Sequence, residues 1–174
     1  RMISSLLRAF SRRTGQVTSP HLQSVTERIA IDGMPISPRD YVDTYRDLEP
    51  YITMVDDSST AAGGPRMSKF EVLTAMAFAA FADAPVDVAI IEVGLGGRWD
   101  ATNVADAQVA VLTPIDLDHT HLLGDDVIAI ADEKAGIIKE GARAVLAGQQ
   151  PEVAKALLRR CAEVGAKVIT EGID

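Results

Sequence analysis

Apolar and polar residues follow patterns along this chain that predict strands and helices in turn. From Phe70 onward, short apolar runs of strand length alternate with stretches of helical period. Such alternation is typical of βαβ units, in which parallel strands share a sheet and helices cover its faces. The sequence therefore predicts an α/β fold with a mainly parallel sheet. The expected strands are 16–18, 28–31, 34–36, 88–92, 109–112, 144–147 and 167–170, and Asp32-Gly33 is expected to be the hairpin turn between the second and the third.

Helix boundaries are indicated by capping residues and by the helical period. One helix is predicted to begin at Ser37, a typical N-cap residue that is followed by a proline, Pro38. Another is predicted to begin at Ser68, which has Glu71 three residues later, as in a capping box. The opening helix is expected to run to about Arg13 and to stop near Gly15. Residues 56–67 are rich in Asp, Ser, Gly and Pro and are expected to form a mobile loop. Further helices are predicted over 126–140, ending at Gly141, and from Pro151 onward.

The segment 88–104 combines a strand, a carboxylate and a glycine cluster. Its continuous apolar run indicates a strand buried on both faces, and Glu92 follows directly. In open α/β sheets, ligands bind beyond the carboxyl ends of the strands. The glycines do not form a dinucleotide fingerprint, because Trp99 stands at the last glycine position. Because Glu92 follows the end of a strand, it is a candidate to bind such a ligand. One possibility is Mg²⁺, which the acidic residue of a Walker-B strand holds in P-loop enzymes.

Three loops at strand ends each carry a candidate metal ligand. These are Ser19, Glu92 and the pair Asp118-His119. If their strands are neighbours, a hydroxyl, a carboxylate and an imidazole point into one crevice and suit a divalent cation. Taken singly, each residue has an ordinary structural interpretation as a turn serine, a strand-end carboxylate or a hydrogen-bonded histidine. His21 and His121 are interpreted as polar groups of loops.

Lys134 occupies an unusual place in the helical pattern at 126–140. The apolar face runs through Val127, Ile130, Ala131 and Ile138, and Lys134 fills the position between the last two. A lysine on a buried face must be paired or lose its proton, and a neutral amine can react with carbon dioxide to give a carbamate. The alternative is that its stem packs while its ammonium reaches solvent.

The composition and charge of the chain limit the kinds of function that it can have. The 174 residues carry a formal net charge of −8, which argues against a nucleic-acid-binding surface. No apolar run is long enough to cross a membrane and no signal peptide is visible, so a cytoplasmic enzyme or binding domain is expected. The single cysteine, Cys161, is expected to be a partly buried thiol.

Several blocks of residues form a pattern that covers most of the chain. The blocks are 18–22 (TSPHL) with 27–29 (ERI), 70–74 (FEVLT), 92–98 (EVGLGGR) with 100–104 (DATNV), 118–119 (DH) with 123–124 (LG), and 130–139 (IADEKAGIIK). Together, and in this order, they resemble the folylpolyglutamate synthase/dihydrofolate synthase family of the Mur ligase superfamily. The resemblance implies a P-loop NTPase-like ATPase domain.

The resemblance implies roles for particular residues. Ser19 and Glu92 correspond to ligands of a first Mg²⁺. His119 and a carbamylated Lys134 correspond to ligands of a second. Phe70 and Thr74 would lie near the pterin pocket, and Asp100 and Asn103 near the substrate or phosphate region.

The implied reaction is ATP-dependent ligation of L-glutamate to a folate or dihydropteroate carboxylate through an acyl phosphate. The family's phosphate-binding loop lies before the opening helix, which here starts at Arg1, and its C-terminal domain is also absent. The chain is therefore expected to be a truncated N-terminal ATPase domain, 1–174, inactive alone, from a monomeric parent without nucleic-acid or membrane partners. Another Mur-type ligase and a non-catalytic nucleotide-fold module remain alternatives.

Overall fold

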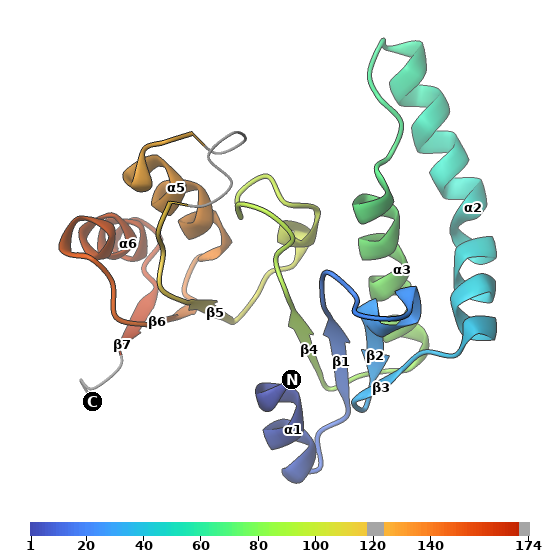
Figure 1. Cartoon of the computed structure of the whole chain (residues 1–174), viewed down its shortest axis with the longest axis horizontal. Helices are drawn as coiled ribbons and strands as arrows, with labels where there is room; N and C mark the ends of the chain where they lie inside the picture. The colour runs from blue at the N-terminus through green and yellow to red at the C-terminus, as the bar shows by residue number, and fades with distance from the viewer. Residues whose placement is uncertain (118–123, 171–174) are drawn as a thin grey trace. The chain divides into compact units, whose positions relative to one another are not determined.

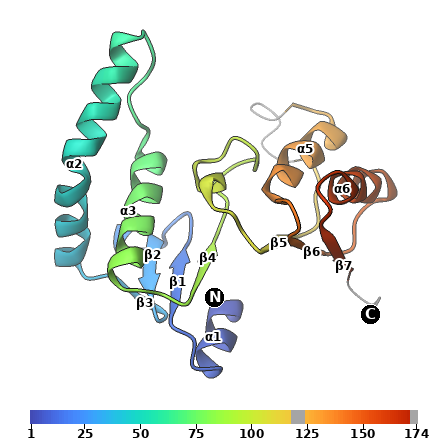
Figure 2. The same ribbon diagram turned by 180° about the vertical axis from the view of Figure 1, so that it is seen from behind.

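The computed structural model describes residues 1–117 and 124–170 and divides into two compact units, Arg1–Glu92 and Val93–Asp174. Figures 1 and 2 show the elements of each unit from opposite sides. The first unit holds a four-stranded sheet in the order β3-β2-β1-β4. β1 and β4 are parallel, whereas the other neighbouring strands are antiparallel. The strands are β1 (Thr14–Val17), β2 (Ile29–Ile31), β3 (Met34–Pro35) and β4 (Val88–Ile91).

The hairpin predicted around Asp32 and Gly33 is present between β2 and β3. Both residues have positive φ, 51° and 78°, as the turns favoured in two-residue hairpins require. A short 3₁₀ helix, η1 (Val25–Arg28), precedes β2. It begins with a capping box formed by Ser24 and Glu27. This arrangement returns the chain from the end of β1 to its antiparallel neighbour.

Three helices accompany this sheet, α1 (Met2–Ala9), α2 (Pro38–Ala61) and α3 (Lys69–Asp83). The predicted caps are confirmed, since Ser37 accepts from Asp40 N and Ser68 forms a capping box with Glu71. α3 packs its apolar face on one side of the sheet, and α2 lies alongside α3 (Figures 1 and 2). The core of this unit consists of Val17, Ile29, Ile36, Leu73, Met76, Ala77, Ala80 and Phe81.

The predicted extent of the opening helix is wrong. α1 ends at Ala9, and Ser11 takes a left-handed backbone conformation, φ 57°, that turns the chain into β1. Gly15 lies inside β1 rather than at a helix end. A Cβ atom there would stand 2.7 Å from the Phe81 ring, so this glycine permits close packing of α3.

The predicted loop at 56–67 is also wrong over its first half. α2 continues through Pro50 to Ala61. Side-chain hydrogen bonds add to the main-chain hydrogen bonds of its last turns. The Thr60 hydroxyl, for example, donates to Asp56 O at 2.8 Å. The Asp56 carboxylate in turn accepts from Met67 N at 2.7 Å, which ties the helix to the segment before α3.

β4 is less buried than its apolar run predicts. Val88, Ile90 and Ile91 are half-buried and Ala89 is exposed, because β4 is the last strand of the first sheet. A continuous apolar run does not by itself distinguish a central strand from an edge strand.

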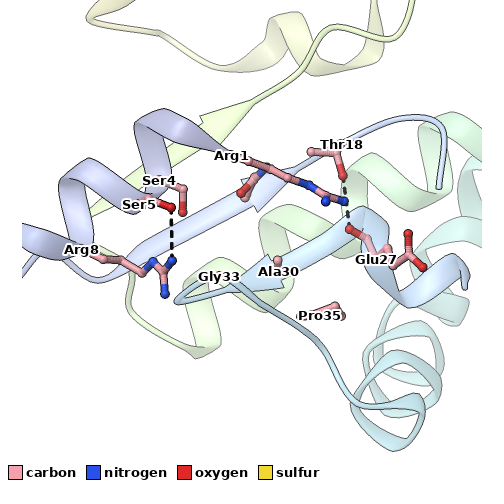
Figure 3. Close-up of a pocket in the computed structure, with 10 residues that line it drawn as sticks. Arg1, Ser4, Ser5, Arg8, Thr18, Glu27, Ala30, Gly33 and Pro35 are labelled. Carbon is pink, nitrogen blue, oxygen red and sulfur yellow. Dashed lines mark hydrogen bonds between the residues drawn. The ribbon is translucent and has the colours of Figure 1, made fainter. Parts of the chain in front are cut away.

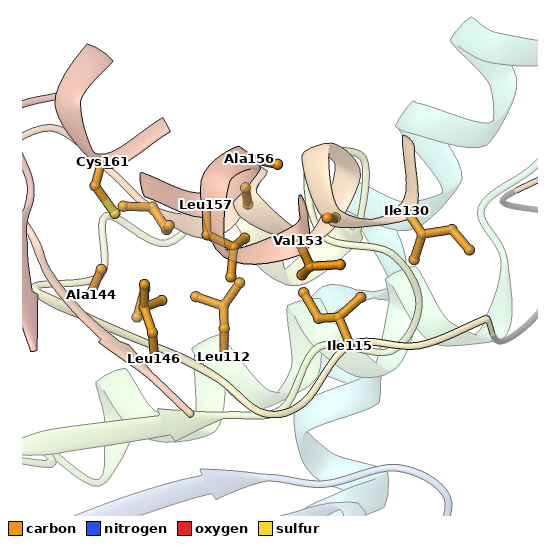
Figure 4. Close-up of a cluster of buried hydrophobic side chains, with 13 residues drawn as sticks. Leu112, Ile115, Ile130, Ala144, Leu146, Val153, Ala156, Leu157 and Cys161 are labelled. Atoms are coloured by element: carbon orange, nitrogen blue, oxygen red, sulfur yellow. The ribbon is translucent and has the colours of Figure 1, made fainter. Parts of the chain in front are cut away.

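The second unit holds a parallel three-stranded sheet in the order β5-β6-β7. Two helices, α5 (Val127–Lys134) and α6 (Pro151–Glu163), pack against it, and their contact forms the core in Figure 4. Leu112, Ile130, Leu146 and Leu157 belong to this core, as does Cys161, where burial raises the pKa of the thiol. The strands are β5 (Val109–Leu112), β6 (Arg143–Leu146) and β7 (Lys167–Thr170), with short 3₁₀ helices η2 (Ala101–Val104) and η3 (Ala135–Ile137).

The helix predicted over 126–140 is α-helical only to Lys134. It then tightens into η3, where Gly136 lies against the backbone of Arg98. The predicted stop at Gly141 is a turn residue with φ 66°. The α/β class with parallel strands and flanking helices is confirmed, although the strands form two sheets. In the described ranges, no helix has both the length and the apolar character needed to cross a membrane.

Candidate functional site

Ser19 and Glu92 lie together at the carboxyl ends of two neighbouring strands. β1 and β4 run parallel in register, with Val17 opposite Ile91, so the loops after them leave the same edge of the sheet. Ser19 N donates to Glu92 Oε2 at 3.0 Å, and Glu92 N donates to Val17 O at 3.1 Å. The Glu92 side chain is exposed. Two of the predicted metal ligands are therefore brought together within the first unit.

Local hydrogen bonds fix the shape of the loop that carries Ser19. The Glu27 carboxylate accepts from the main-chain N–H groups of Leu22, Gln23 and Ser24 at 3.0, 3.1 and 2.9 Å. These bonds, that of Leu22 first, hold the pKa of Glu27 below its usual value. His21 Nδ1 accepts from Arg28 Nε at 2.8 Å, which agrees with its interpretation as a loop polar group.

Asp100 organises the glycine loop that opens the second unit. Its Oδ2 accepts from Gly94 N at 3.1 Å and from Leu95 N at 2.9 Å. Its Oδ1 accepts from Thr102 N at 2.9 Å and from the Thr102 hydroxyl. Each carboxylate oxygen thus serves two donors of the loop itself. In the structure, Asp100 therefore fixes the conformation of the loop. A contact of Asp100 with substrate or phosphate stays a prediction.

The glycine loop is fastened to the end of α5 by a second set of bonds. Arg98 N donates to Glu133 O at 2.9 Å, and Trp99 N donates to Glu133 Oε1 at 3.1 Å. The Asn103 amide donates to Arg98 O at 3.0 Å and to Gly136 O at 3.3 Å. Asn103, predicted near the substrate or phosphate region, therefore joins the loop to η3.

Two glycines permit this contact. A Cβ atom on Gly97 would lie 2.8 Å from both Glu133 O and Lys134 O, and one on Gly136 would lie 2.6 Å from Arg98 Cα. Backbone therefore packs directly on backbone, which residues with a side chain cannot do. Sequence reasoning missed the roles of Glu133 and Gly136, and a glycine inside a helical pattern was the available signal for the second.

Lys134 is the last residue of α5 and is half-buried. Ile130, Ala131 and Ile138 on the same apolar pattern are fully buried, which confirms the face predicted from the helical period. The carbonyl of Lys134 packs against Gly97, so the glycine loop fixes the position of its backbone. Carbamylation of Lys134 stays a prediction.

Phe70 and Thr74 lie on α3, one turn apart. Phe70 is half-buried, whereas Thr74 is 4% exposed and its Oγ1 has no hydrogen-bond partner in the described part of the chain. A role of either residue in a pterin pocket stays a prediction. His119 lies outside the described residues. Within 1–117 and 124–170, no group of three His, Cys, Asp or Glu side chains is placed to hold a metal.

Comparison with curated proteins identifies close relatives, although no family model matches the chain. It is 57% identical over 98% of its length to a dihydrofolate synthase/folylpolyglutamate synthase of Mycobacterium tuberculosis. It is 42% identical over 86% of its length to the Bacillus subtilis protein of the same description. The chain belongs to the folylpolyglutamate synthase/dihydrofolate synthase family. It spans 37% and 34% of the lengths of these two relatives.

Solved structures of folylpolyglutamate synthases share the fold of this chain. The Mycobacterium tuberculosis enzyme complexed with ADP and AMPPCP matches 97% of the chain with a TM-score of 0.92 and 57% identity. A folylpolyglutamate synthase complex with AMPPCP and folate matches 97% of it with a TM-score of 0.89 and 36% identity. The chain covers 39% and 40% of those two structures. The match extends through both units, so both belong to the architecture of folylpolyglutamate synthases.

Proposed function

We propose that the full-length protein containing this chain is an ATP-dependent ligase that joins L-glutamate to the carboxylate of a folate or dihydropteroate. The observation that carries this proposal is the 57% identity, over nearly the whole chain, to an enzyme whose structure binds ADP and AMPPCP. ATP transfers its γ-phosphoryl group to the carboxylate, which gives an acyl phosphate and ADP. The glutamate amine then attacks the acyl carbon, and phosphate leaves as the amide forms and the amine loses a proton.

The proposed first Mg²⁺ site consists of Ser19 and Glu92. The fit rests on the chemistry of the two side chains and on the hydrogen bond from Ser19 N to the Glu92 carboxylate. Hydroxyl and carboxylate oxygens are the ligands that Mg²⁺ prefers, and Glu92 is exposed with Oε1 outside its bond to Ser19 N. A bound Mg²⁺ would neutralise charge on the phosphate oxygens. The Ser19 main-chain N–H orients the carboxylate for that task.

The proposed second site consists of His119 and a carbamylated Lys134. Lys134 is supported by its half-buried place at the end of α5, among buried apolar residues and against the glycine loop. Carbamylation replaces an ammonium with an oxygen-bearing anion, which converts a cation into a metal ligand. Asp100 and Asn103, which hold the glycine loop, are proposed to lie near the substrate or phosphate region, and Phe70 and Thr74 to lie near the pterin. The protein is proposed to be a cytoplasmic monomer whose 1–174 segment is part of one ATPase domain.

The function is tested by an assay of the full-length protein for ADP release and for glutamate incorporation. We expect both only when ATP, Mg²⁺, L-glutamate and a folate or dihydropteroate are all present. Amide formation with a cell-wall nucleotide acid instead would favour another Mur-type ligase. A protein that binds nucleotide and forms no amide with either class of acid would be a non-catalytic module.

Lys134 is tested by mass spectrometry and by substitution. In bicarbonate buffer, native mass spectrometry of the full-length protein should show an added carbamate mass that Lys134→Arg lacks. Lys134→Ala should lower kcat by about a hundredfold or more, the usual effect of losing a group that stabilises charge in the transition state. Lys155→Ala, on the exposed side of α6, is the matched control and should retain activity. Equal carbamate mass in the wild type and in Lys134→Arg would overturn the assignment.

A further inference from the structure

A cleft with polar walls lies between α1 and the sheet of the first unit (Figure 3). Its volume is about 260 Å³, a little below the roughly 300–1,000 Å³ typical of sites for drug-sized ligands. It opens on the face of the sheet that carries Thr14, which is hydrogen-bonded to Ser4 of α1 at 3.1 Å. None of the residues proposed above for ligation lines it.

The floor of the cleft is a row of three residues on neighbouring strands. Gln16 on β1 lies opposite Ala30 on β2, and Ala30 lies opposite Pro35 on β3. Gln16 is 7% exposed, and its side-chain amide makes no hydrogen bond to any residue that the structure describes. Ala30 and Pro35 carry no polar side-chain group that could serve it. The side-chain amide is therefore open to the cleft, and its N–H groups are available to donate to a ligand there.

Two guanidinium groups lie along the cleft. Arg8 is fixed at one end, because its Nη1 donates to Asp32 O at 2.9 Å and its guanidinium covers Gly33. Figure 3 shows Arg8 beside Ser5 and shows the Arg1 side chain reaching toward Thr18 at the other end. A guanidinium has five N–H donors, so Arg8 keeps donors for a ligand after these bonds are made.

The carboxylate of the acidic residue in the lining is held by its own loop. The Glu27 carboxylate is occupied by three main-chain N–H groups of its own loop, from Leu22, Gln23 and Ser24. Glu27 contributes its main-chain carbonyl to this side, where Thr18 Oγ1 donates to it at 3.2 Å. In Figure 3 its carboxylate is turned away from Thr18.

We propose that this cleft binds a small oxyanion, a carboxylate or phosphate group, beneath α1. Gln16 donates to the anion from the floor, and Arg8 supplies the charge and further N–H donors from the rim. A guanidinium paired with an oxyanion forms charge-assisted bonds, which are the strongest hydrogen bonds available here. The site is separate in its residues from the proposed magnesium ligands, so it would be a second binding site of the protein.

Calorimetric titration of the full-length protein tests the proposal, with inorganic phosphate and with succinate in separate experiments at constant ionic strength. Arg8→Gln should weaken binding of the preferred anion by about tenfold, the effect of losing one charge-assisted hydrogen bond. Arg12→Gln is the matched control, since it removes the same charge from an exposed residue outside the cleft, and should leave the affinity unchanged. The stronger of the two anions identifies the chemistry of the natural ligand.

A second variant, Gln16→Leu, tests the proposal independently in case Arg8→Gln destabilises the protein. Gln16→Leu removes the unpaired amide and should keep or raise the Tm of the protein without ligand. It should also abolish the increase in Tm that the preferred anion produces in the wild type. An undiminished increase in Gln16→Leu, or equal weakening by Arg8→Gln and Arg12→Gln, would overturn the proposal.

Discussion

Replacing Glu92 with alanine in the full-length protein should lower kcat for glutamate ligation by at least about a hundredfold. Glu92 is proposed to hold Mg²⁺ where charge builds on transferring phosphoryl oxygens, so its loss removes stabilisation of the transition state. The fold should survive, because the side chain is exposed and, among the residues that the structure describes, makes one hydrogen bond, to Ser19 N. That bond contributes about 1 kcal/mol to the free energy of unfolding. Steady-state kinetics over a range of Mg²⁺ concentrations and thermal unfolding are the two measurements.

Two further variants isolate the charge of Glu92. Glu92→Gln keeps the size and the acceptor oxygen for Ser19 N but removes the charge, and it should be nearly as inactive as Glu92→Ala. Glu140→Ala removes an exposed carboxylate from the turn after η3 and should leave kcat unchanged. Wild-type turnover of Glu92→Gln at saturating Mg²⁺ would remove Glu92 from the metal site.

Replacing Gly136 with alanine should destabilise the second unit by about 2–3 kcal/mol, in the range of an overpacked core. The added Cβ would lie 2.5 Å from Arg98 Cβ and 2.6 Å from Arg98 Cα. These are backbone and near-backbone atoms that cannot rotate away, so the glycine loop must separate from η3. Asn103 would then lose its bond to Gly136 O. Urea unfolding and the ligation assay should both register the change.

Gly148→Ala is the matched control for Gly136→Ala. A Cβ atom on Gly148 would meet no atom within 4 Å, and its φ is not in the left-handed region. This variant should be neutral or stabilise the protein by about 0.4–1 kcal/mol, because alanine restricts the unfolded chain. Equal stabilities of Gly136→Ala and Gly148→Ala would show that the loop does not depend on close backbone contact.

Features set by local chemistry could be predicted from the sequence. The caps at Ser37 and Ser68 and the turn at Asp32 depend on residues within a few positions of each other. The meeting of Ser19 and Glu92 follows from one further rule, that parallel strands end at the same edge of a sheet. The length of α2 was not predictable in this way, because its last turn is held by Asp56, which bonds to Met67 beyond the helix end.

The contacts that sequence reasoning missed are long-range. Nothing near Gly136 in the sequence indicates that Arg98 will lie against it, and nothing near Gly15 indicates the Phe81 ring. In both cases the glycine was visible, but its partner is determined by tertiary packing. Likewise, the motif of Asp100 indicates a residue near the ligand. In the structure, both of its carboxylate oxygens accept hydrogen bonds from the loop itself.

The hydrogen bonds and backbone contacts between the glycine loop and α5 limit how these two segments can move. Gly97 packs on the carbonyl of Lys134, and Glu133 holds both Arg98 N and Trp99 N. Two segments joined by backbone contact and by paired hydrogen bonds move together unless those bonds break. A displacement of the glycine loop would therefore carry the backbone of Lys134 with it, so the loop and the end of α5 behave as one mechanical element.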